Sequence, residues 1–273
     1  MSISSISSSA TKLTFAQSSR YALFGWTFFV LENAILSENR TFIIEEIFQN
    51  DEQKYHAAYG TLSTLACAMI AAGYKKVRHS GPIVAPSRVR LLAAFALQAA
   101  GLIGASQMAP KLQIPVGYGP AEPSSGPLAS ADPSTSSSKL QVKCPFDFTP
   151  TPDSPVYGLN RVSRHPGLWS FAFLGLGSAA ATASVPQALC LAGPVLVAVA
   201  GGAHQDSRFR RGLGGSLPPD VDAKTSNVPF LAMVTGAQGE GAFSGLAKEL
   251  KPLNAAAAVA VAAGFALRRG RGM

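Results

Sequence analysis

The stretch "GLWSFAFLGLGSAAATASVPQALCLAGPVLVAVAGGA", residues 167–203, decides the fold. It contains no charged side chain, and the sequence around Ser184 and Pro186 divides it into two apolar halves, 167–183 and 185–203. Each half has about the length that a helix needs to cross the hydrocarbon core of a bilayer. Because so few residues connect them, the halves are predicted to form a tight antiparallel hairpin of membrane helices.

Four other segments resemble the two halves of the hairpin in length and hydrophobicity, although the last is short and rich in Ala and Val. Their Gly, Ala and Ser residues favour close packing between helices in lipid. The sequence therefore predicts an all-α, polytopic integral-membrane bundle of about five to six transmembrane helices. The apolar stretch 228–235 is too short to span and is predicted to be interfacial or re-entrant. The four segments are 21–36, 55–74, 91–108 and 255–267.

The composition agrees with a membrane protein and argues against other classes. Hydrophobic residues make up 47% of the chain and charged residues only 14%, about half of the usual globular share. The net charge of +8 does not indicate nucleic-acid binding, because the basic residues flank apolar runs. Anionic membrane lipids are the expected partners. The three cysteines form no CxxC pattern, so neither a disulfide framework nor a zinc site is expected.

The chain is expected to divide into four parts. Residues 1–20 are rich in Ser and Thr and contain no acid, which indicates either a plastid- or mitochondrion-type targeting segment or an ordinary disordered terminus. Residues 21–108 hold the first three membrane helices. Residues 109–156 form a Pro/Ser-rich loop that has no packed core. Residues 157–268 hold the hairpin, the strongest motifs and the last helix.

The hairpin places its two flanking sequences, "RVSRHP" and "GGAHQDSRFRRG", on the same side of the membrane. Pro166 suits the first helical position, and Ser163 or His165 is expected to cap that helix. A helix start beside guanidinium groups is a good site for an anion, although snorkelling to lipid phosphates explains the same pattern. The candidate anion- or headgroup-binding residues are Arg161, Arg164, His165, Arg208, Arg210 and Arg211.

Two acids are candidate counter-charges for these cations. Asp206 lies within the second flanking sequence, and Glu32 lies late in the first apolar segment. A carboxylate at membrane depth is costly, so Glu32 is expected either to lie at the interface or to be buried beside an arginine such as Arg164 or Arg40. No metal site is predicted, because the histidines form no close i,i+3 or i,i+4 pair.

Sidedness is not decided by the sequence. One end of the bundle is expected to carry Lys75, Lys76, Arg78, Arg88, Arg90, Arg268, Arg269 and Arg271, and the other end carries the arginines of the hairpin. Because both ends are basic, the positive-inside rule does not choose between them.

The run "RVSRHPGLWSFAFLGLG", then "GAHQDSRFRRGLGG", then "TSNVPFLAMVTGAQ" resembles the NnrU family, which includes the plastid zeta-carotene isomerases. The resemblance covers residues 157–238 well and extends weakly to the first two apolar segments. It implies a multi-helix membrane protein of a plastid membrane, linked to carotenoid isomerisation and holding an apolar isoprenoid ligand.

The resemblance also implies a b-type haem bound through histidines, but this chain has diverged at both ligand positions. One position holds Glu32 or Asn33, and the other holds Ser178, none of which is a strong axial ligand. The favoured interpretation is therefore a non-enzymatic or divergent NnrU-type membrane protein.

Two enzymatic alternatives remain open. The first is a haem-dependent isomerase with a substitute ligand such as His56. The second is a membrane S-adenosylmethionine-dependent methyltransferase, because those enzymes also place Arg-His-Pro before a membrane helix. Against the second, "AHQDSRFRRG" offers one Asp and no Glu. The substrate and the oligomeric state are not indicated.

Overall fold

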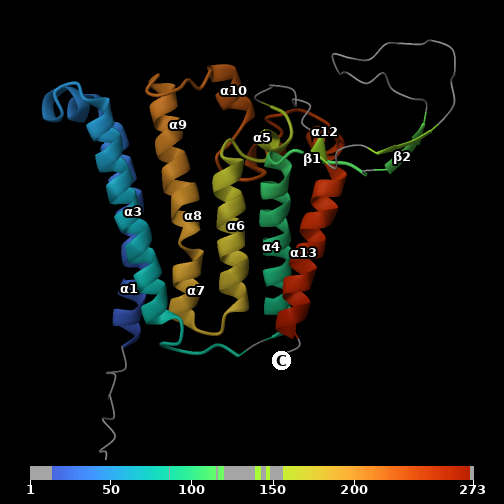
Figure 1. Ribbon diagram of the computed structural model, residues 1–273, viewed down its shortest axis with the longest axis horizontal. Coiled ribbons are helices and arrows are strands. Elements are labelled where there is room, and N and C mark those ends of the chain that lie inside the picture. The colour runs from blue at the N-terminus through green and yellow to red at the C-terminus, as the bar shows by residue number, and fades with distance from the viewer. Residues whose placement is uncertain are drawn as a thin grey trace, which may run out of the picture.

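Long helices standing side by side make up the body of the protein (Figure 1). The computed structural model describes residues 14–85, 87–114, 116–119, 139–142, 146–147 and 156–270. Each of the six predicted membrane segments lies in a helix, which confirms the all-α fold class. These helices are α1 (Phe15–Glu38), α3 (Glu52–Val77), α4 (Arg88–Met108), α6 (Pro166–Ala181), the run Val185–Arg210, and α13 (Pro252–Gly270).

The run Val185–Arg210 is built from four consecutive pieces. They are α7 (Val185–Ala192), α8 (Pro194–Leu196), the π-helical turn η2 (Val197–Gly201) and α9 (Gly202–Arg210). Pro194 has no amide hydrogen to donate to the carbonyl of Cys190. Instead, the indole Nε1 of Trp26 in α1 donates to that carbonyl at 2.7 Å. A contact between two helices thus replaces the hydrogen bond that the proline removes.

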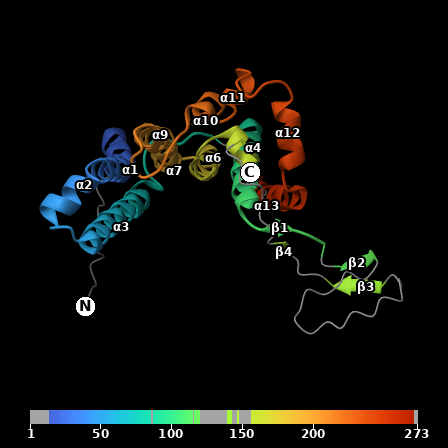
Figure 2. The ribbon, with the colours of Figure 1, turned by 90° about the horizontal axis from the view of Figure 1, so that it is seen from above.

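The helices form one curved row rather than a closed ring (Figure 2). Helix α3 packs on α1, α1 on α7, α7 on α6, α6 on α4, and α4 on α13. The contact between α4 and α6 is close because Gly101 has no side chain. A Cβ atom there would lie 2.7 Å from the carbonyl oxygen of Ser170. Small residues therefore set the helix spacing, as the sequence predicts.

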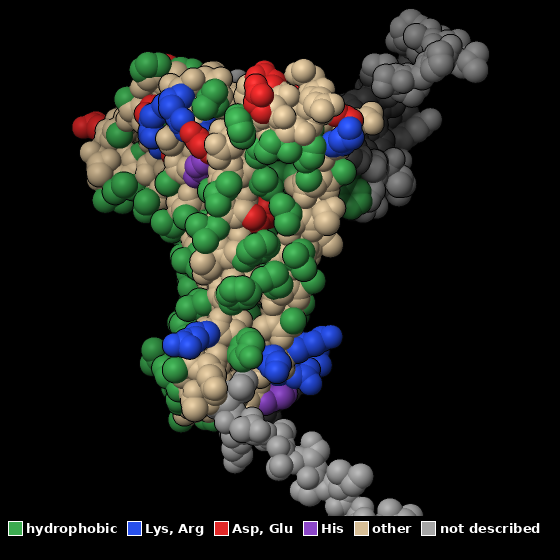
Figure 3. Space-filling model, turned by 90° about the vertical axis from the view of Figure 1, so that its left-hand side faces the viewer, with side chains coloured by type: hydrophobic (Ala, Val, Ile, Leu, Met, Phe, Trp, Pro, Cys, Tyr) green, Lys and Arg blue, Asp and Glu red, His purple; other side chains and the backbone are tan. Residues whose placement is uncertain are grey.

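On the face shown in Figure 3, hydrophobic side chains cover much of the middle of the row, between two charged ends. Within the described residues, the helices Glu52–Val77, Arg88–Met108 and Val185–Arg210 are long and apolar enough to cross a membrane. Helices α12 (Ala242–Glu249) and α13 are bent by 86° and would add a fourth crossing if they form one broken span. Two helices are not among these candidate spans. They are α6, which has only 16 residues, and α1, which carries Glu32.

The two ends of the row differ in structure. The end at the top of Figure 1, here the upper end, holds the short helices α5 (Leu159–Val162), α10 (Pro219–Lys224), α11 (Leu231–Val234) and α12. The segments between α1 and α3, namely α2 (Arg40–Phe42) and the π-helical turn η1 (Ile43–Ile47), lie there too. The lower end holds the turns at 78–85 and 182–184 and the last residues of α13. The stretch 228–235, predicted as interfacial or re-entrant, thus contains a single short helix, α11.

Two predicted segments differ in the structure. Phe15 to Arg20, assigned to a disordered or targeting terminus, are helical, because Thr14 and Gln17 form a reciprocal capping box at the start of α1. Residues 1–13 lie outside the described residues. Parts of the Pro/Ser-rich loop pair as antiparallel strands, β1 (Lys111–Leu112) with β4 (Phe146–Asp147) and β2 (Val116–Gly119) with β3 (Lys139–Val142).

Candidate functional site at the upper end of the bundle

The hairpin brings its two flanking sequences together at the upper end. Helix α6 begins there at Pro166, the first helical residue, and α9 ends there at Arg210 (Figure 1). The expected side-chain cap on α6 is wrong, since neither Ser163 nor His165 caps it. The Ser163 hydroxyl instead accepts from the amide of His165 at 3.1 Å and donates to the carbonyl of Asn227 at 2.7 Å. It therefore joins the start of α6 to the segment after α10.

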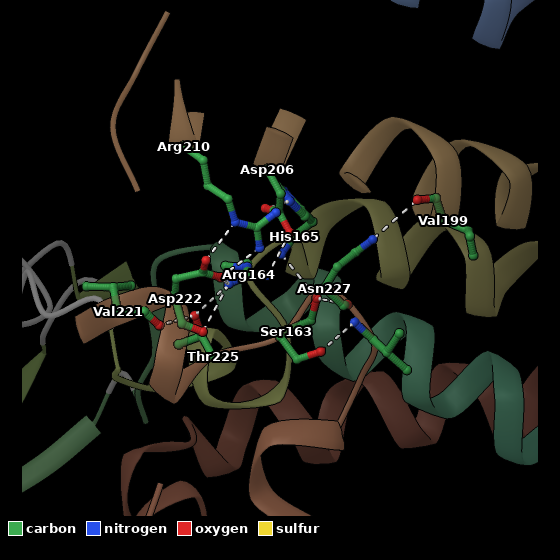
Figure 4. Close-up of polar contacts among 12 residues, drawn as sticks. Ser163, Arg164, His165, Val199, Asp206, Arg210, Val221, Asp222, Thr225 and Asn227 are labelled. Carbon is green, nitrogen blue, oxygen red and sulfur yellow. Dashed lines mark hydrogen bonds and ion pairs between the residues drawn. The ribbon is translucent and has the colours of Figure 1, made fainter. Parts of the chain in front are cut away.

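Asp206 lies at the centre of the first ion-pair cluster (Figure 4). Its carboxylate accepts from Nη2 of Arg164 at 2.7 Å and contacts Nε2 of His165 at 2.8 Å. The Asp206 side chain is only 5% exposed, and those of Arg164 and His165 are 12% and 9% exposed. A buried pair such as this is costly to break, because either partner alone would be an uncompensated charge.

Asp222 in α10 extends the cluster on the other side of Arg164 (Figure 4). Arg210 donates to it through Nε at 2.6 Å and Nη2 at 2.8 Å, and Arg164 also donates to it. The hydrogen bonds from Arg210, together with those from Arg164, outweigh partial burial and lower the pKa of Asp222 to about 2. The carboxylate is therefore ionised at neutral pH and bridges two guanidinium groups.

Two other arginines of the predicted set bind acids that the sequence analysis did not select. Arg161 donates to Glu249 of α12 at 2.7 and 2.8 Å, and the Gly158 amide donates to the same carboxylate at 2.6 Å. Arg211 donates to Glu38 at 2.6 and 2.9 Å. Carboxylates of the chain itself are thus the anions bound by Arg161, Arg164, Arg210 and Arg211 in the structure.

Arg208 differs from the other arginines of the set. Among the described residues its side chain makes no hydrogen bond and no ion pair, and its Nε atom is buried without a partner. It lines a cavity between α1 and α9. Arg208 is therefore the member of the predicted anion-binding set whose charge no described carboxylate neutralises directly.

Glu32 is buried, with 7% of its surface exposed, rather than interfacial. Ser63 and Asn33 donate to its Oε1 at 2.9 and 2.6 Å. The expected arginine partner is wrong within the described residues, because Arg164 binds Asp206 and Asp222 and Arg40 binds Glu52. Hydroxyl and amide groups bind its Oε1 instead, and its Oε2 is buried with no hydrogen-bond partner among the described residues.

Asn227 connects the motif segments to one another (Figure 4). Its Oδ1 accepts from the indole of Trp169 at 3.0 Å, and its Nδ2 donates to the carbonyls of Ala198 and Val199 at 3.2 and 3.3 Å. The two carbonyls belong to η2, where the π-helical turn alters the regular hydrogen bonding. The apolar segment that follows is held by Phe230, whose amide donates to the Val162 carbonyl at 2.8 Å.

An apolar cavity of about 240 Å³ lies directly beside these motif segments. It is here called the motif cavity. The α4 residues in its wall include Ala100 and Ile103, α12 contributes Leu246, and Leu250 follows directly after α12. Aromatic side chains of Trp169, Phe173 and Phe230 form much of the remaining wall. A mainly apolar and aromatic wall is typical of a site for a hydrophobic small molecule.

The four histidines do not provide a free haem ligand, because none lines the motif cavity and His204, which lines the cavity beside Arg208, is bound to Ser37. His165 is engaged by Asp206, and His204 contacts the Ser37 hydroxyl through Nε2 at 2.8 Å. His56 and His79 are exposed at opposite ends of α3. None of the four lines the motif cavity. Across the described part of the chain, no group of three or more His, Cys, Asp or Glu side chains is arranged to hold a metal ion.

Comparison with known proteins places this architecture in one family. The family model described as NnrU protein matches residues 24–267, which is nearly the whole chain. No curated protein and no solved structure matches the chain.

Proposed function

The chain belongs to the NnrU family, and we propose that it is a plastid-membrane protein that binds an apolar isoprenoid of carotenoid type, without haem, in the motif cavity. The observation that carries this proposal is the cavity itself. Its wall is almost wholly apolar, and the motif segments on which the family resemblance rests form part of it, together with residues of α4 and of the α12 region. Its position among membrane helices makes it accessible to a ligand that is dissolved in lipid.

The ion-pair cluster supports the cavity rather than taking part in a reaction. Arg161 ties α5 to α12, and Arg164 ties the start of α6 to α9 and α10. Both helices α6 and α12 contribute to the cavity wall. Preorganised walls reduce the cost of binding, because fewer side chains must be ordered when the ligand enters.

The residues of this chain argue against both enzymatic alternatives. A haem-dependent isomerase needs an axial ligand, and the diverged positions hold Glu32, Asn33 and Ser178. A methyltransferase of the Arg-His-Pro type needs Arg164 and His165 to face its cofactor, but both side chains bind Asp206. The proposed function is therefore binding, and no covalent step is assigned to any residue.

A titration with retinol, a fluorescent isoprenoid polyene, tests the proposal in neutral detergent. Trp169 lies in the cavity wall, so bound retinol should receive energy from tryptophan and its fluorescence should rise to saturation. The variant Ala100→Phe places a ring at an exposed position of the cavity wall. Overfilling of this kind costs about 1–3 kcal/mol, so the affinity should fall about tenfold or more.

Ala96→Phe is the matched control, because Ala96 is exposed on α4 one turn earlier and does not line the cavity. It should bind retinol as the unmodified protein does. Equal affinity in the Ala96→Phe and Ala100→Phe variants would show that retinol binds elsewhere, and the proposed function would then be wrong.

A further inference from the structure

A second cavity, of about 330 Å³, lies between α1 and the run from η2 to α9 and is separate from the motif cavity. It is here called the α1–α9 cavity. Its wall changes in character along the helix axes. Phe29 and Val30 of α1 and Val197 of η2 line one part, while Ser37, His204 and Arg208 line the part nearer the upper end. An apolar part below a polar, cationic part matches the two halves of an amphiphile.

The length of this cavity also suits a chain-bearing ligand. Val197 and Arg208 lie eleven positions apart on one helical run, and both line the cavity. At 1.5 Å of rise per residue this separation corresponds to about 16 Å along the axis. The upper part lies where α9 ends, two residues before Arg210.

Arg208 marks the charged end of the cavity. Its Nε atom is buried, and no described group accepts a hydrogen bond from it. A buried donor without a partner costs about 1–3 kcal/mol, and more when it is charged. The nearby carboxylate of Glu38 does not bind Arg208, because Arg211 donates hydrogen bonds to both of its oxygens. Arg208 is thus a half-buried cation that no described carboxylate of the chain binds.

Other polar groups of the wall are compatible with an anionic head. Beside Arg208, the Ser37 hydroxyl contacts His204 Nε2 at 2.8 Å and donates its one hydrogen to the carbonyl of Ala34 at 3.3 Å, so the Arg208 guanidinium is the main donor for a ligand. Asn33 and Tyr59 lie deeper and bind each other. Guanidinium groups bind carboxylates and phosphates through short, charge-assisted hydrogen bonds.

We propose that the α1–α9 cavity binds an anionic amphiphile, with a carboxylate or phosphate at Arg208 and an alkyl chain along Phe29, Val30 and Val197. This site is independent of the proposed isoprenoid site, because the two cavities share no lining residue. The ligand chemistry is that of a fatty acid or of an anionic phospholipid.

Equilibrium binding of radiolabelled oleate to the full-length protein in neutral maltoside detergent tests the inference. Oleate is compared with methyl oleate, which has the same chain without the charge. The unmodified protein should bind oleate at least tenfold more tightly, because a hydrogen bond to a charged group contributes about 1.5–3 kcal/mol. Competition by phosphatidylglycerol, but not by phosphatidylcholine, would identify a lipid headgroup as the anion; competition by neither would identify the free fatty acid.

Two variants locate the site. Arg208→Gln should lower oleate affinity about tenfold and leave methyl oleate binding unchanged. Lys248→Gln is the control, because Lys248 is an exposed cation of α12 that lines neither cavity. Equal binding of oleate and methyl oleate by the unmodified protein would overturn the inference, whether or not the variants fold. Undiminished oleate binding by Arg208→Gln would overturn it as well.

Discussion

At the scale of single residues, carboxylates of the chain itself bind most of the arginines that flank the hairpin. The sequence predicts correctly that these cations gather at one end, because a short hairpin must bring its ends together. Their partners are less predictable, since Asp206 and Asp222 lie 42 and 58 positions from Arg164, and Glu249 lies 88 positions from Arg161. Only packing of α9, α10 and α12 against α6 and α5 brings them within reach. Asp206 was selected because it lies inside the hairpin motif, whereas Asp222 and Glu249 carry no local signal.

The buried pair of Arg164 and Asp206 gives the first prediction. Arg164→Met leaves the 5%-exposed Asp206 carboxylate without its main counter-charge, so unfolding should become easier by about 3–5 kcal/mol. The double variant Arg164→Met/Asp206→Leu removes both charges and should recover much of that loss. Thermal unfolding in detergent measures both. A double variant that is less stable than Arg164→Met would contradict this account of the pair.

The low pKa of Asp222 gives a prediction about pH. The folded-state pKa, about 2, is below the ordinary value of 3.8, so this carboxylate stabilises the folded state at pH values above 3.8. The contribution should diminish as pH falls from about 4 towards 2, when the folded state must also take up the proton. Asp222→Asn should be less stable at pH 6, and its difference from the unmodified protein should shrink over that window. A constant difference from pH 6 to pH 2 would argue against the ion pair.

At the scale of helices, close contacts explain details that hydrophobicity alone does not give. All six apolar segments are predicted correctly as helices, and the hairpin is placed correctly. The break at Pro194 is not predicted, because its repair requires Trp26 from α1 to donate to the Cys190 carbonyl. The loop between residues 109 and 156 shows a further limit, since the pairing of β1 with β4 joins short strands more than thirty positions apart.

Two helical glycines make a matched test of this packing. A Cβ atom at Gly101 would meet the Ser170 carbonyl oxygen at 2.7 Å, whereas a Cβ atom at Gly60 would meet nothing within 4 Å. Gly101→Ala should therefore separate α4 from α6 and destabilise the fold by about 1–3 kcal/mol. Gly60→Ala should be neutral or stabilising by up to about 1 kcal/mol, because alanine favours the helix. Thermal unfolding of the two variants side by side checks this, and equal effects would contradict the close approach.

At the scale of the whole molecule, the two ends differ in how their charges are balanced. The segments that reach the lower end, 14–31, 53–85, 87–114, 166–205 and 250–270, contain no acid, although Arg20, Lys75, Lys76, Arg78, Arg88, Arg90 and Arg268 lie near that end. At the upper end, Arg161, Arg164, Arg210 and Arg211 are neutralised by carboxylates. The sequence predicts that both ends are basic. In the structure, carboxylates bind these four arginines at the upper end, whereas the segments that reach the lower end contain no carboxylate side chain.

The position of the basic residues predicts the orientation in the membrane. Lys75, Lys76, Arg78, Arg88 and Arg90 flank the short connection between α3 and α4 at the lower end. Basic residues close to the ends of membrane helices and beside short loops favour the side from which the protein is inserted, so the lower end should face that compartment. Cysteine labelling of sealed membranes measures this, with His79→Cys at the lower end and Ser216→Cys at the upper end, both in a background whose native cysteines are replaced. A membrane-impermeant maleimide should label only Ser216→Cys from the opposite side. Labelling of only His79→Cys from that side would reverse the orientation.

The central claim is that this NnrU protein keeps the family's membrane architecture and binds an apolar ligand without haem. The most direct test is the visible absorption spectrum of the protein, purified after expression with ample haem supply. Because no described histidine is free to act as an axial ligand in the motif cavity, we expect no stoichiometric Soret band, and any visible absorbance should be that of a polyene. A Soret band at one haem per chain that disappears in a histidine variant, His56→Ala for example, would contradict the claim.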